Sequence, residues 1–238
     1  MKRRMKMRKG LDISQYQGNP DFAQVKAAGY DFVIMRAGFG KSITQKDPVF
    51  ETNYKNAKAA GLDVGVYWYS YAQSAEDAKK EAQVCLQAIA GKQFEYPIYF
   101  DMEEKSQMKS MAFCDSLIKA FCNEIEAGGY YAGLYSNLYT LNTFISEEVR
   151  RRYAVWLAQW TSKPTYNGPY GMWQKSAKGG VPGIKGDVDI DEGYIDYPTI
   201  IKARGLNGFP KATTPEPQPA VHTVKLVIDG KTVYEGGI

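Results

Sequence analysis

The sequence predicts an α/β fold, an irregular (β/α) barrel of eight strands with few helices after strand five, plus a C-terminal β-hairpin. Short apolar segments typical of buried strands begin near residues 9, 32, 63, 97, 131, 154, 170 and 187. The first five are 23 to 34 residues apart, which leaves room for a helix in each connection, whereas later gaps of 16 and 17 residues leave little. This order favours a closed parallel barrel. An open doubly wound sheet is the alternative, but no glycine-rich phosphate loop follows the first strand.

Helix ends are marked by glycine and helix starts by capping residues. A glycine precedes the second, third and fifth strands, in Ala27-Ala28-Gly29, Ala59-Ala60-Gly61 and Ala127-Gly128-Gly129. Asn19-Pro20 and Asp47-Pro48 each place a capping residue before a proline, which indicates a helix start. A further helix is expected from Ser74 to about Gly91, because its apolar positions keep helical spacing.

The scarcity of histidine narrows the chemistry. The only histidine is His222, and the three cysteines are Cys85, Cys114 and Cys122. A histidine-based triad, a multi-histidine zinc site or a disulfide framework is therefore not expected. Catalysis would depend on carboxylates, tyrosines or lysines, and we expect neither a metal ion nor a cofactor.

The positive net charge of +4 comes from the first ten residues, which hold six cations and no acid. The rest of the chain has 24 Lys and Arg against 26 Asp and Glu, so we expect no nucleic-acid partner. The basic start lacks the apolar stretch of a signal peptide, and no apolar run approaches membrane-spanning length. We therefore expect synthesis in the cytoplasm and no membrane insertion.

Four segments are predicted along the chain. Residues 1–8 form a basic tail, 9–205 the barrel, 206–222 a Pro-rich linker and 223–238 a β-hairpin turning at Asp229-Gly230. A two-residue turn would pair Leu226 with Val233 and Val227 with Thr232. Because a lone hairpin is marginal in water, it is either part of a truncated module or an element for targeting or self-association.

The segment that ends the fourth strand carries two acids. In Phe100-Asp101-Met102-Glu103, strand alternation puts Asp101 and Glu103 on one face and Met102 on the other. Such a pair at the carboxyl end of a barrel strand repel each other, which raises one pKa and leaves an acid beside a base. Glycosidic bond cleavage requires this combination. Alternatively, the acids cap the helix that follows.

Two further acids are expected at the same end of the barrel. Asp12 ends the first strand and shares a face with Ser14, and Asp189 lies in the run Asp187-Val188-Asp189-Ile190-Asp191 of the eighth strand. Strands one and eight become neighbours when a barrel closes, so these acids would converge with Asp101 and Glu103. The alternatives are a solvated acidic edge and a cation site, although the spacing of a calcium loop is missing.

These residues together resemble glycoside hydrolase family 25, the muramidases that include phage endolysins and bacterial wall lysozymes. The resemblance runs from about Lys9 to Ile201 and rests on an ordered set of motifs: Gly10-Leu11-Asp12-Ile13-Ser14, Phe32-Val33-Ile34-Met35-Arg36-Ala37, Gly65-Val66-Tyr67, Asp101-Met102-Glu103, Gly133-Leu134-Tyr135-Ser136, Trp156-Leu157-Ala158-Gln159-Trp160, Met172-Trp173-Gln174 and Val188-Asp189. The sequence departs from the family pattern at Trp68, where histidine is common, and at Trp160, where tyrosine is common.

The resemblance implies hydrolysis of the β-1,4 bond between N-acetylmuramic acid and N-acetylglucosamine in peptidoglycan. It gives Glu103 the general-acid position, and makes Asp101 the residue that orients and charge-stabilises the substrate's 2-acetamido group. Independently, two acids on one face of a strand leave little room for a water between them, which favours retention. Asp12 and Asp189 match the supporting acids. Two alternatives remain, the same barrel acting on another N-acetylated glycan such as chitin, and a wall-binding protein without catalysis. The expected place of action is the cell wall, after release by lysis or a separate export route.

Substrate contacts are expected from side chains near strand ends. Aromatic rings stack on sugar faces, although most tyrosines of this chain would be ordinary packing residues. Arg36 would meet a substrate carboxylate or pair with an acid of the barrel. The complete set of candidate substrate-binding residues is Arg36, Tyr67, Tyr135, Trp160, Trp173 and Gln174.

Overall fold

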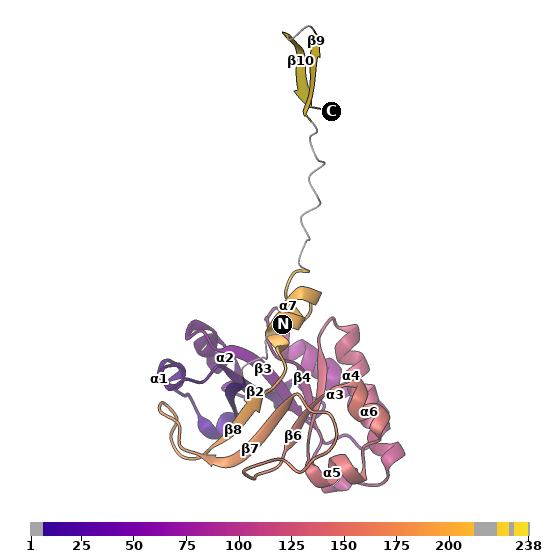
Figure 1. Ribbon diagram of the computed structural model, residues 1–238. Helices are drawn as coiled ribbons and strands as arrows, with labels where there is room; N and C mark the ends of the chain where they lie inside the picture. Colours follow the sequence, from indigo (N-terminus) through magenta and orange to yellow (C-terminus); the bar gives the residue numbers. More distant parts are fainter. Residues whose placement is uncertain (1–6, 212–222, 229–230, 238) are drawn as a thin grey trace.

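The eight predicted strands form a closed barrel in sequence order (Figure 1). The computed structural model describes residues 7–211, 223–228 and 231–237. The barrel strands are β1 (Arg8–Ile13), β2 (Phe32–Phe39), β3 (Asp63–Tyr69), β4 (Ile98–Asp101), β5 (Ala132–Asn137), β6 (Ala154–Ala158), β7 (Met172–Gly179) and β8 (Val188–Gly193). The prediction of an irregular eight-stranded barrel is confirmed.

The strand directions correct the expectation of an all-parallel barrel. Neighbouring strands from β1 to β7 are parallel, but β8 runs antiparallel to both β7 and β1. The connection from Gly179 to Val188 contains no helix, and a parallel crossover needs a longer connection than this. As a result, the first residues of β8 lie at the end of the barrel where the other strands finish.

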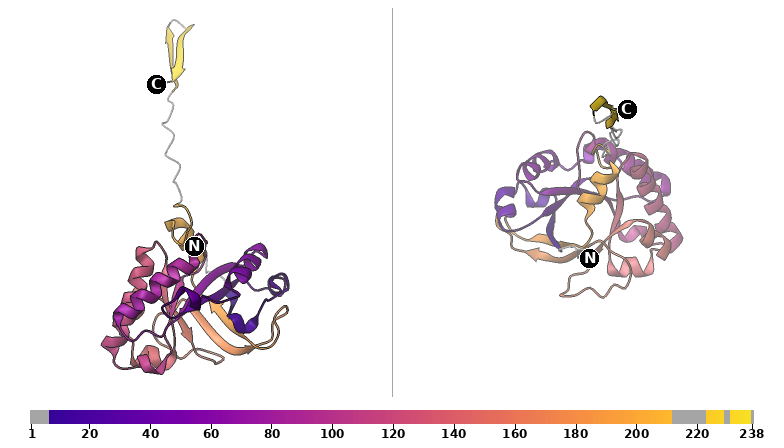
Figure 2. Two further views of the ribbon diagram at one scale, coloured as in Figure 1. Left: turned by 180° about the vertical axis from the view of Figure 1, so that it is seen from behind. Right: turned by 45° about the horizontal axis from the view of Figure 1, so that its top comes forward.

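Helices cover much of the outside of the barrel, whereas β7 and β8 lie uncovered (Figures 1 and 2). They are α1 (Phe22–Ala27), α2 (Phe50–Ala59), α3 (Ala75–Ile89), α4 (Met111–Ala127), α5 (Leu138–Thr143), α6 (Glu147–Arg152) and α7 (Tyr197–Arg204). Single 3-10 turns lie at Gln15–Gln17, Ile43–Gln45 and Lys105–Gln107. The helices after β5 are short, as the strand spacing predicts. None of the helices in the described residues is long and apolar enough to cross a membrane.

Two predicted helix starts are wrong by two residues. The first helix begins at Phe22, and its N-terminus is capped by the side chain of Asp21 rather than by Asn19. The second begins at Phe50. Asp47 Oδ1 accepts from the amide of Val49 in the turn before it, while Oδ2 accepts from Arg36 and from the backbone amide of Gln15. The start at Ser74 is confirmed, since its hydroxyl accepts a hydrogen bond from the amide of Asp77.

Aromatic rings fill the barrel interior toward the end where the strands begin, and glycines on neighbouring strands leave space for these rings. A Cβ on Gly10 would lie 2.1 Å from the ring of Phe32, and one on Gly133 would lie 2.6 Å from the ring of Tyr99. At the end where the strands begin, Tyr197 of α7 packs against Tyr96 and Tyr131. This end of the barrel is therefore closed, which leaves the opposite end for a site.

The packed body extends beyond the predicted boundary at residue 205. Asn207 is fully buried, and its side-chain amide donates to the carbonyls of Phe94 and Tyr96 and accepts from the amide of Tyr131. Most of the predicted basic tail and of the Pro-rich linker lies outside the described residues, so neither expectation is addressed.

The C-terminal strands pair as an antiparallel hairpin of β9 (Thr223–Ile228) and β10 (Lys231–Gly237). Val227 pairs with Thr232, as predicted, but Leu226 pairs with Tyr234 instead of Val233. The register shifts between Thr232 and Tyr234, which is the irregularity that a β-bulge introduces. The Asp229-Gly230 turn itself lies outside the described residues.

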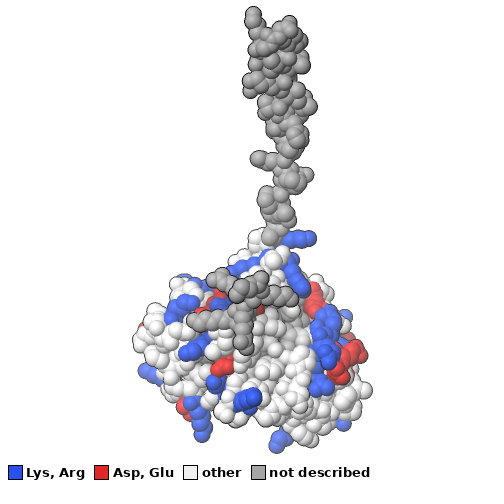
Figure 3. Space-filling model, in the orientation of Figure 1, with Lys and Arg blue, Asp and Glu red and all other residues white. Residues whose placement is uncertain are grey.

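Basic and acidic side chains lie next to one another on the face shown in Figure 3, close to α4 and α6. Ion pairs join these helices, at Arg152 with Glu126 and at Lys119 with Glu148. The charges of this region therefore largely compensate each other, which agrees with the near-neutral composition of the chain after residue 10.

Candidate active site

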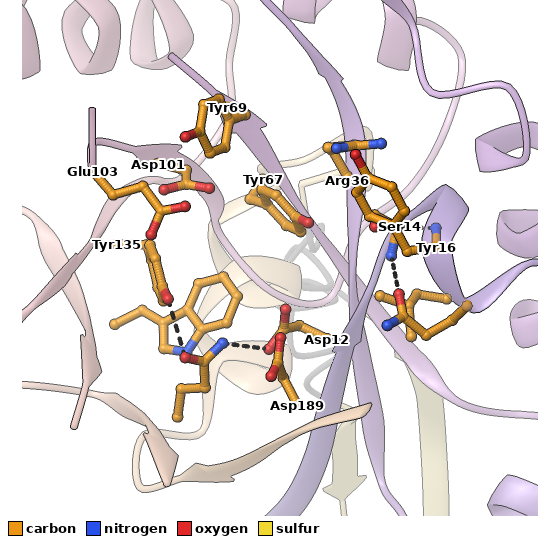
Figure 4. A pocket seen from close by; sticks show the side chains of 14 residues that line it. Asp12, Ser14, Tyr16, Arg36, Tyr67, Tyr69, Asp101, Glu103, Tyr135 and Asp189 are labelled. Carbon is orange, nitrogen blue, oxygen red and sulfur yellow. Dashed lines mark hydrogen bonds between the residues drawn. The ribbon is translucent and has the colours of Figure 1, made fainter. Parts of the chain in front are cut away.

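A pocket of about 230 Å³ opens at the end of the barrel where β1 to β7 finish (Figure 4). We call this end the barrel mouth. All eight strands or the residues that directly follow them contribute to its lining, which comprises Asp12, Ile13, Ser14, Tyr16, Gln17, Arg36, Tyr67, Tyr69, Asp101, Glu103, Tyr135, Trp156, Gln174 and Asp189. The mouth thus collects all four predicted catalytic acids.

Asp101 and Glu103 lie on one side of the pocket, and Met102 between them points into the hydrophobic core. The backbone around them is fixed, because the amide of Met102 donates to the Tyr135 carbonyl at 3.2 Å and the Ser136 hydroxyl donates to the Met102 carbonyl at 2.9 Å. The predicted sharing of one face by the two carboxyls is confirmed.

Both carboxyls of this pair have raised pKa values. Burial is the main cause of the raised pKa of Asp101, the neighbouring Glu103 raises it further, and Arg36 opposes the change. Burial also raises the pKa of Glu103, with smaller contributions from the charges of Glu104 and Asp189. Two carboxyls with raised pKa values therefore stand side by side, and the positive charge of Arg36 opposes the shift at Asp101.

Asp12 and Asp189 face each other across the pairing of β1 with β8. The side-chain amide of Gln174 donates to Asp12 Oδ2 at 2.9 Å, and its carbonyl oxygen accepts from the Tyr135 hydroxyl at 3.0 Å. Burial raises the pKa of Asp12 well above its usual range, and the charges of Asp191 and Asp189 add to the shift. Gln174 thus connects these supporting acids to the side of the pocket that holds Tyr135.

Arg36 is the one cation among the described residues that line the pocket. Its Nε donates to Asp47 Oδ2 at 2.8 Å, so it does pair with an acid of the barrel. Its guanidinium also lies 5.3 Å from the ring centre of Tyr16, and Nη2 has no hydrogen-bond partner among the described residues. Arg36 therefore places a fixed positive charge beside the four acids.

The aromatic predictions are only partly matched by the structure. Tyr67 and Tyr135 line the pocket, and Trp160 exposes 67% of its surface while its indole N–H donates to Gln174. Trp173 is a correction, because it is 3% exposed, packs in the core and donates to the Gln159 carbonyl. Trp68 also lies in the core and donates to the Gly40 carbonyl.

Three pocket-lining aromatic residues were not among the predicted site residues: Tyr16, Tyr69 and Trp156. Tyr69 is two residues after Tyr67 on β3, so strand alternation could have indicated it. No sequence signal marks Trp156, which reaches the pocket from within the barrel. Among the described residues, no group of three or more Asp, Glu, His or Cys side chains could hold a metal ion.

A barrel mouth that holds two neighbouring carboxyls with raised pKa values has the arrangement of a glycoside hydrolase. The model of glycosyl hydrolases family 25 matches residues 11–184, and the chain belongs to this family. It is 30% identical over 207 residues to an autolytic lysozyme of Clostridium acetobutylicum, covering 84% of this chain and 61% of that protein. It is 29% identical over 201 residues to lysozyme M1 of Streptomyces globisporus, covering 76% of this chain and 65% of that protein.

Solved structures of similar proteins share the fold. The CTP1L endolysin matches with a TM-score of 0.72 and 27% identity, over 83% of this chain and 70% of that one. A bacterial lysozyme from Streptomyces coelicolor matches with a TM-score of 0.69 and 26% identity, over 78% of this chain and 91% of that one. The chain thus spans about three fifths of the Clostridium relative, but most of the Streptomyces coelicolor structure.

Proposed function

We propose that this protein is a muramidase that hydrolyses the β-1,4 bond between N-acetylmuramic acid and N-acetylglucosamine in bacterial peptidoglycan. The observation that carries the proposal is the Asp101–Glu103 pair at the barrel mouth, with Asp12 and Asp189 beside it. The names of the family relatives support the substrate, since two are lysozymes and a pneumococcal autolysin of similar fold has a structure with a synthetic peptidoglycan ligand.

Glu103 is the general acid in this proposal. Burial and the nearby carboxylates raise its pKa, which favours the protonated form that can give a proton to the glycosidic oxygen as the bond to the sugar C1 breaks. Once deprotonated, it can accept a proton from the water that completes hydrolysis. Its activity should therefore fall as the pH rises through its raised pKa.

Asp101 orients and charge-stabilises the 2-acetamido group of the substrate, whose oxygen attacks C1 as the leaving group departs. Arg36 supports this role, because its positive charge favours the ionised form of Asp101. Water then opens the resulting ring from the side on which the leaving group stood, so the configuration at C1 is retained overall. Asp12 and Asp189 stabilise the positive charge that develops on the sugar.

Tyr67 and Tyr135 contact the sugar within the pocket, and Trp160 supplies an exposed ring at its edge for a neighbouring sugar. Arg36 and Gln174 provide the polar contacts. The protein acts on the cell wall, which it reaches from the cytoplasm by lysis or by a separate export route.

The test is the variant Glu103→Gln, which keeps the shape of the side chain and removes the proton. We expect its rate of wall hydrolysis to fall by about a hundredfold or more, with unchanged circular dichroism and unchanged binding to purified walls. Glu76→Gln is the matched control, because Glu76 is an exposed acid in the first turn of α3. A Glu103→Gln variant that retains more than about a tenth of the activity would contradict the assignment.

A further inference from the structure

Asp191 is a buried acid directly beneath the supporting acids of the mouth. It lies two residues after Asp189 on β8, opposite Gly10 of β1 and Gln174 of β7, so it points into the barrel one layer below Asp12. It is completely inaccessible to solvent. Its Oδ1 accepts a hydrogen bond of 2.8 Å from the indole N–H of Trp156, which itself lines the pocket.

The Asp12 carboxyl is placed to form a hydrogen bond with Asp191, as it is with Asp189, although all three are carboxyls. Such a bond needs a proton on one of them. No N–H or hydroxyl group among the described residues donates to Oδ2 of Asp191. A proton between Asp12 and Asp191 would therefore have to belong to one of these two carboxyls.

Among the described residues, no cation is found to compensate the charge of Asp191. The groups that face it are Asp12 from β1, Asp189 from its own strand and Tyr99 from β4, together with the neutral side chains of Trp156 and Gln174. Arg36 of β2 is already paired with Asp47. Two buried carboxyls in contact without a cation cannot both be ionised at neutral pH.

We propose that Asp191 is a positioning residue that shares one proton with Asp12 and so holds the Asp12 carboxyl in place beneath the substrate. Burial supports the sharing, since it raises the pKa of Asp191 to about 8 and that of Asp12 well above its usual range. The shared proton also limits the negative charge under Asp101 and Glu103. The positioning role rests on the proposed muramidase activity, whereas the shared proton does not.

Two substitutions of Asp191 distinguish the effect of its hydrogen bonds on activity from the effect of its side-chain volume. In Asp191→Asn, the amide can still accept from Trp156 and donate to Asp12, so we expect hydrolysis of walls within about fivefold of the parent. In Asp191→Leu, which has a similar volume, both bonds are lost, and we expect a decrease of at least about tenfold with unchanged circular dichroism. A folded Leu variant with parental activity, or an Asn variant as inactive as the Leu variant, would overturn the positioning role.

A measurement of stability tests the shared proton without any substrate. Carboxyls whose folded-state pKa is raised bind more protons in the folded than in the unfolded protein, so stability falls as pH rises from about 4 through the raised pKa. The parent should therefore lose more of its Tm between pH 5 and pH 8 than Asp191→Asn does. Asp187→Asn, which alters an exposed acid of the same run, is the control and should follow the parent.

Wall hydrolysis and the pH dependence of Tm test the positioning role and the shared proton separately. If Tm falls in parallel for the parent and Asp191→Asn from pH 5 to pH 8, the shared proton is excluded, whatever the activity. If the parent does not hydrolyse walls, the muramidase assignment and the positioning role fail, while the pH dependence of Tm still decides whether the pair holds a proton. A Leu variant that does not fold leaves the Asn variant to decide both questions.

Discussion

Met102 separates the two carboxyls on which the chemistry of the mouth depends. It is fully buried in the core, and its backbone is held by Tyr135 and Ser136. The positions of Asp101 and Glu103 therefore follow from the packing of a neutral side chain, which does not change with pH. This arrangement brings two acids to one side of the pocket.

The proposed role of Asp101 predicts the stereochemistry of the product. If the 2-acetamido group attacks C1 with help from Asp101, the newly formed reducing end should retain the β configuration of the substrate. Proton NMR of a soluble peptidoglycan oligosaccharide, recorded before the anomers equilibrate, measures this directly. Initial release of the α anomer would show inversion and would exclude the proposed role of Asp101.

Residue periodicity predicts which face a side chain occupies, but not which layer of the barrel. It correctly placed Asp12, Asp101, Glu103 and Asp189 together. It could not distinguish Trp173, which is buried in the core, from rings that line the pocket. Trp156 was missed as a site residue because its access to the pocket depends on the space left by residues from other strands.

At the scale of elements, the reversal of β8 explains how Asp189 comes to face Asp12. In a parallel strand, the second residue would lie near the closed end of the barrel, whereas in β8 it lies at the mouth. An alternating run of acids is the same in either direction, so its pattern does not reveal how the strand runs. The short spacing after residue 170 was the only sign of an irregularity here, because it leaves no room for a crossover helix.

Glycines on the barrel strands give the second prediction. A Cβ on Gly133 of β5 would lie 2.6 Å from the Tyr99 ring and 2.8 Å from the Ala154 carbonyl oxygen, so Gly133→Ala should force the ring or the strand to move. We expect a loss of about 1–3 kcal/mol, or a decrease in Tm of at least about 3 °C. Differential scanning calorimetry measures this change.

The control for this prediction is Gly180→Ala. Nothing lies within 4 Å of a Cβ at Gly180, and its φ is not positive. Its Tm should stay within about 1 °C of the parent, because an unstrained exposed substitution has little effect. Equal Tm values for both alanine variants would mean that Tyr99 does not depend on the space that Gly133 provides.

At the scale of the whole molecule, the barrel and the C-terminal hairpin have separate roles in our proposal. Every residue that lines the mouth lies between Asp12 and Asp189, and Asn207 closes the packed body. We therefore propose that the hairpin serves targeting or self-association rather than chemistry. The pairing of β9 with β10 agrees with the predicted hairpin but leaves this role to experiment.

Truncation after Lys211 tests this division of roles. Because the cut preserves the contacts of Asn207, hydrolysis of soluble peptidoglycan fragments should remain within about threefold of the full chain. Hydrolysis of intact walls, or the oligomeric mass measured by light scattering, should decrease. A folded truncated protein that no longer cleaves soluble fragments would show that the C-terminal segment contributes to the mouth.

The identity of the sugar at the new reducing end tests the proposed function most directly. Purified peptidoglycan is digested, reduced with borohydride, hydrolysed with acid and analysed for amino-sugar alcohols, with Glu103→Gln as the inactive control. A muramidase leaves N-acetylmuramic acid at the new reducing end, so we predict muramitol. Glucosaminitol in its place, or no new reducing ends with a folded parent protein, would contradict the proposed function.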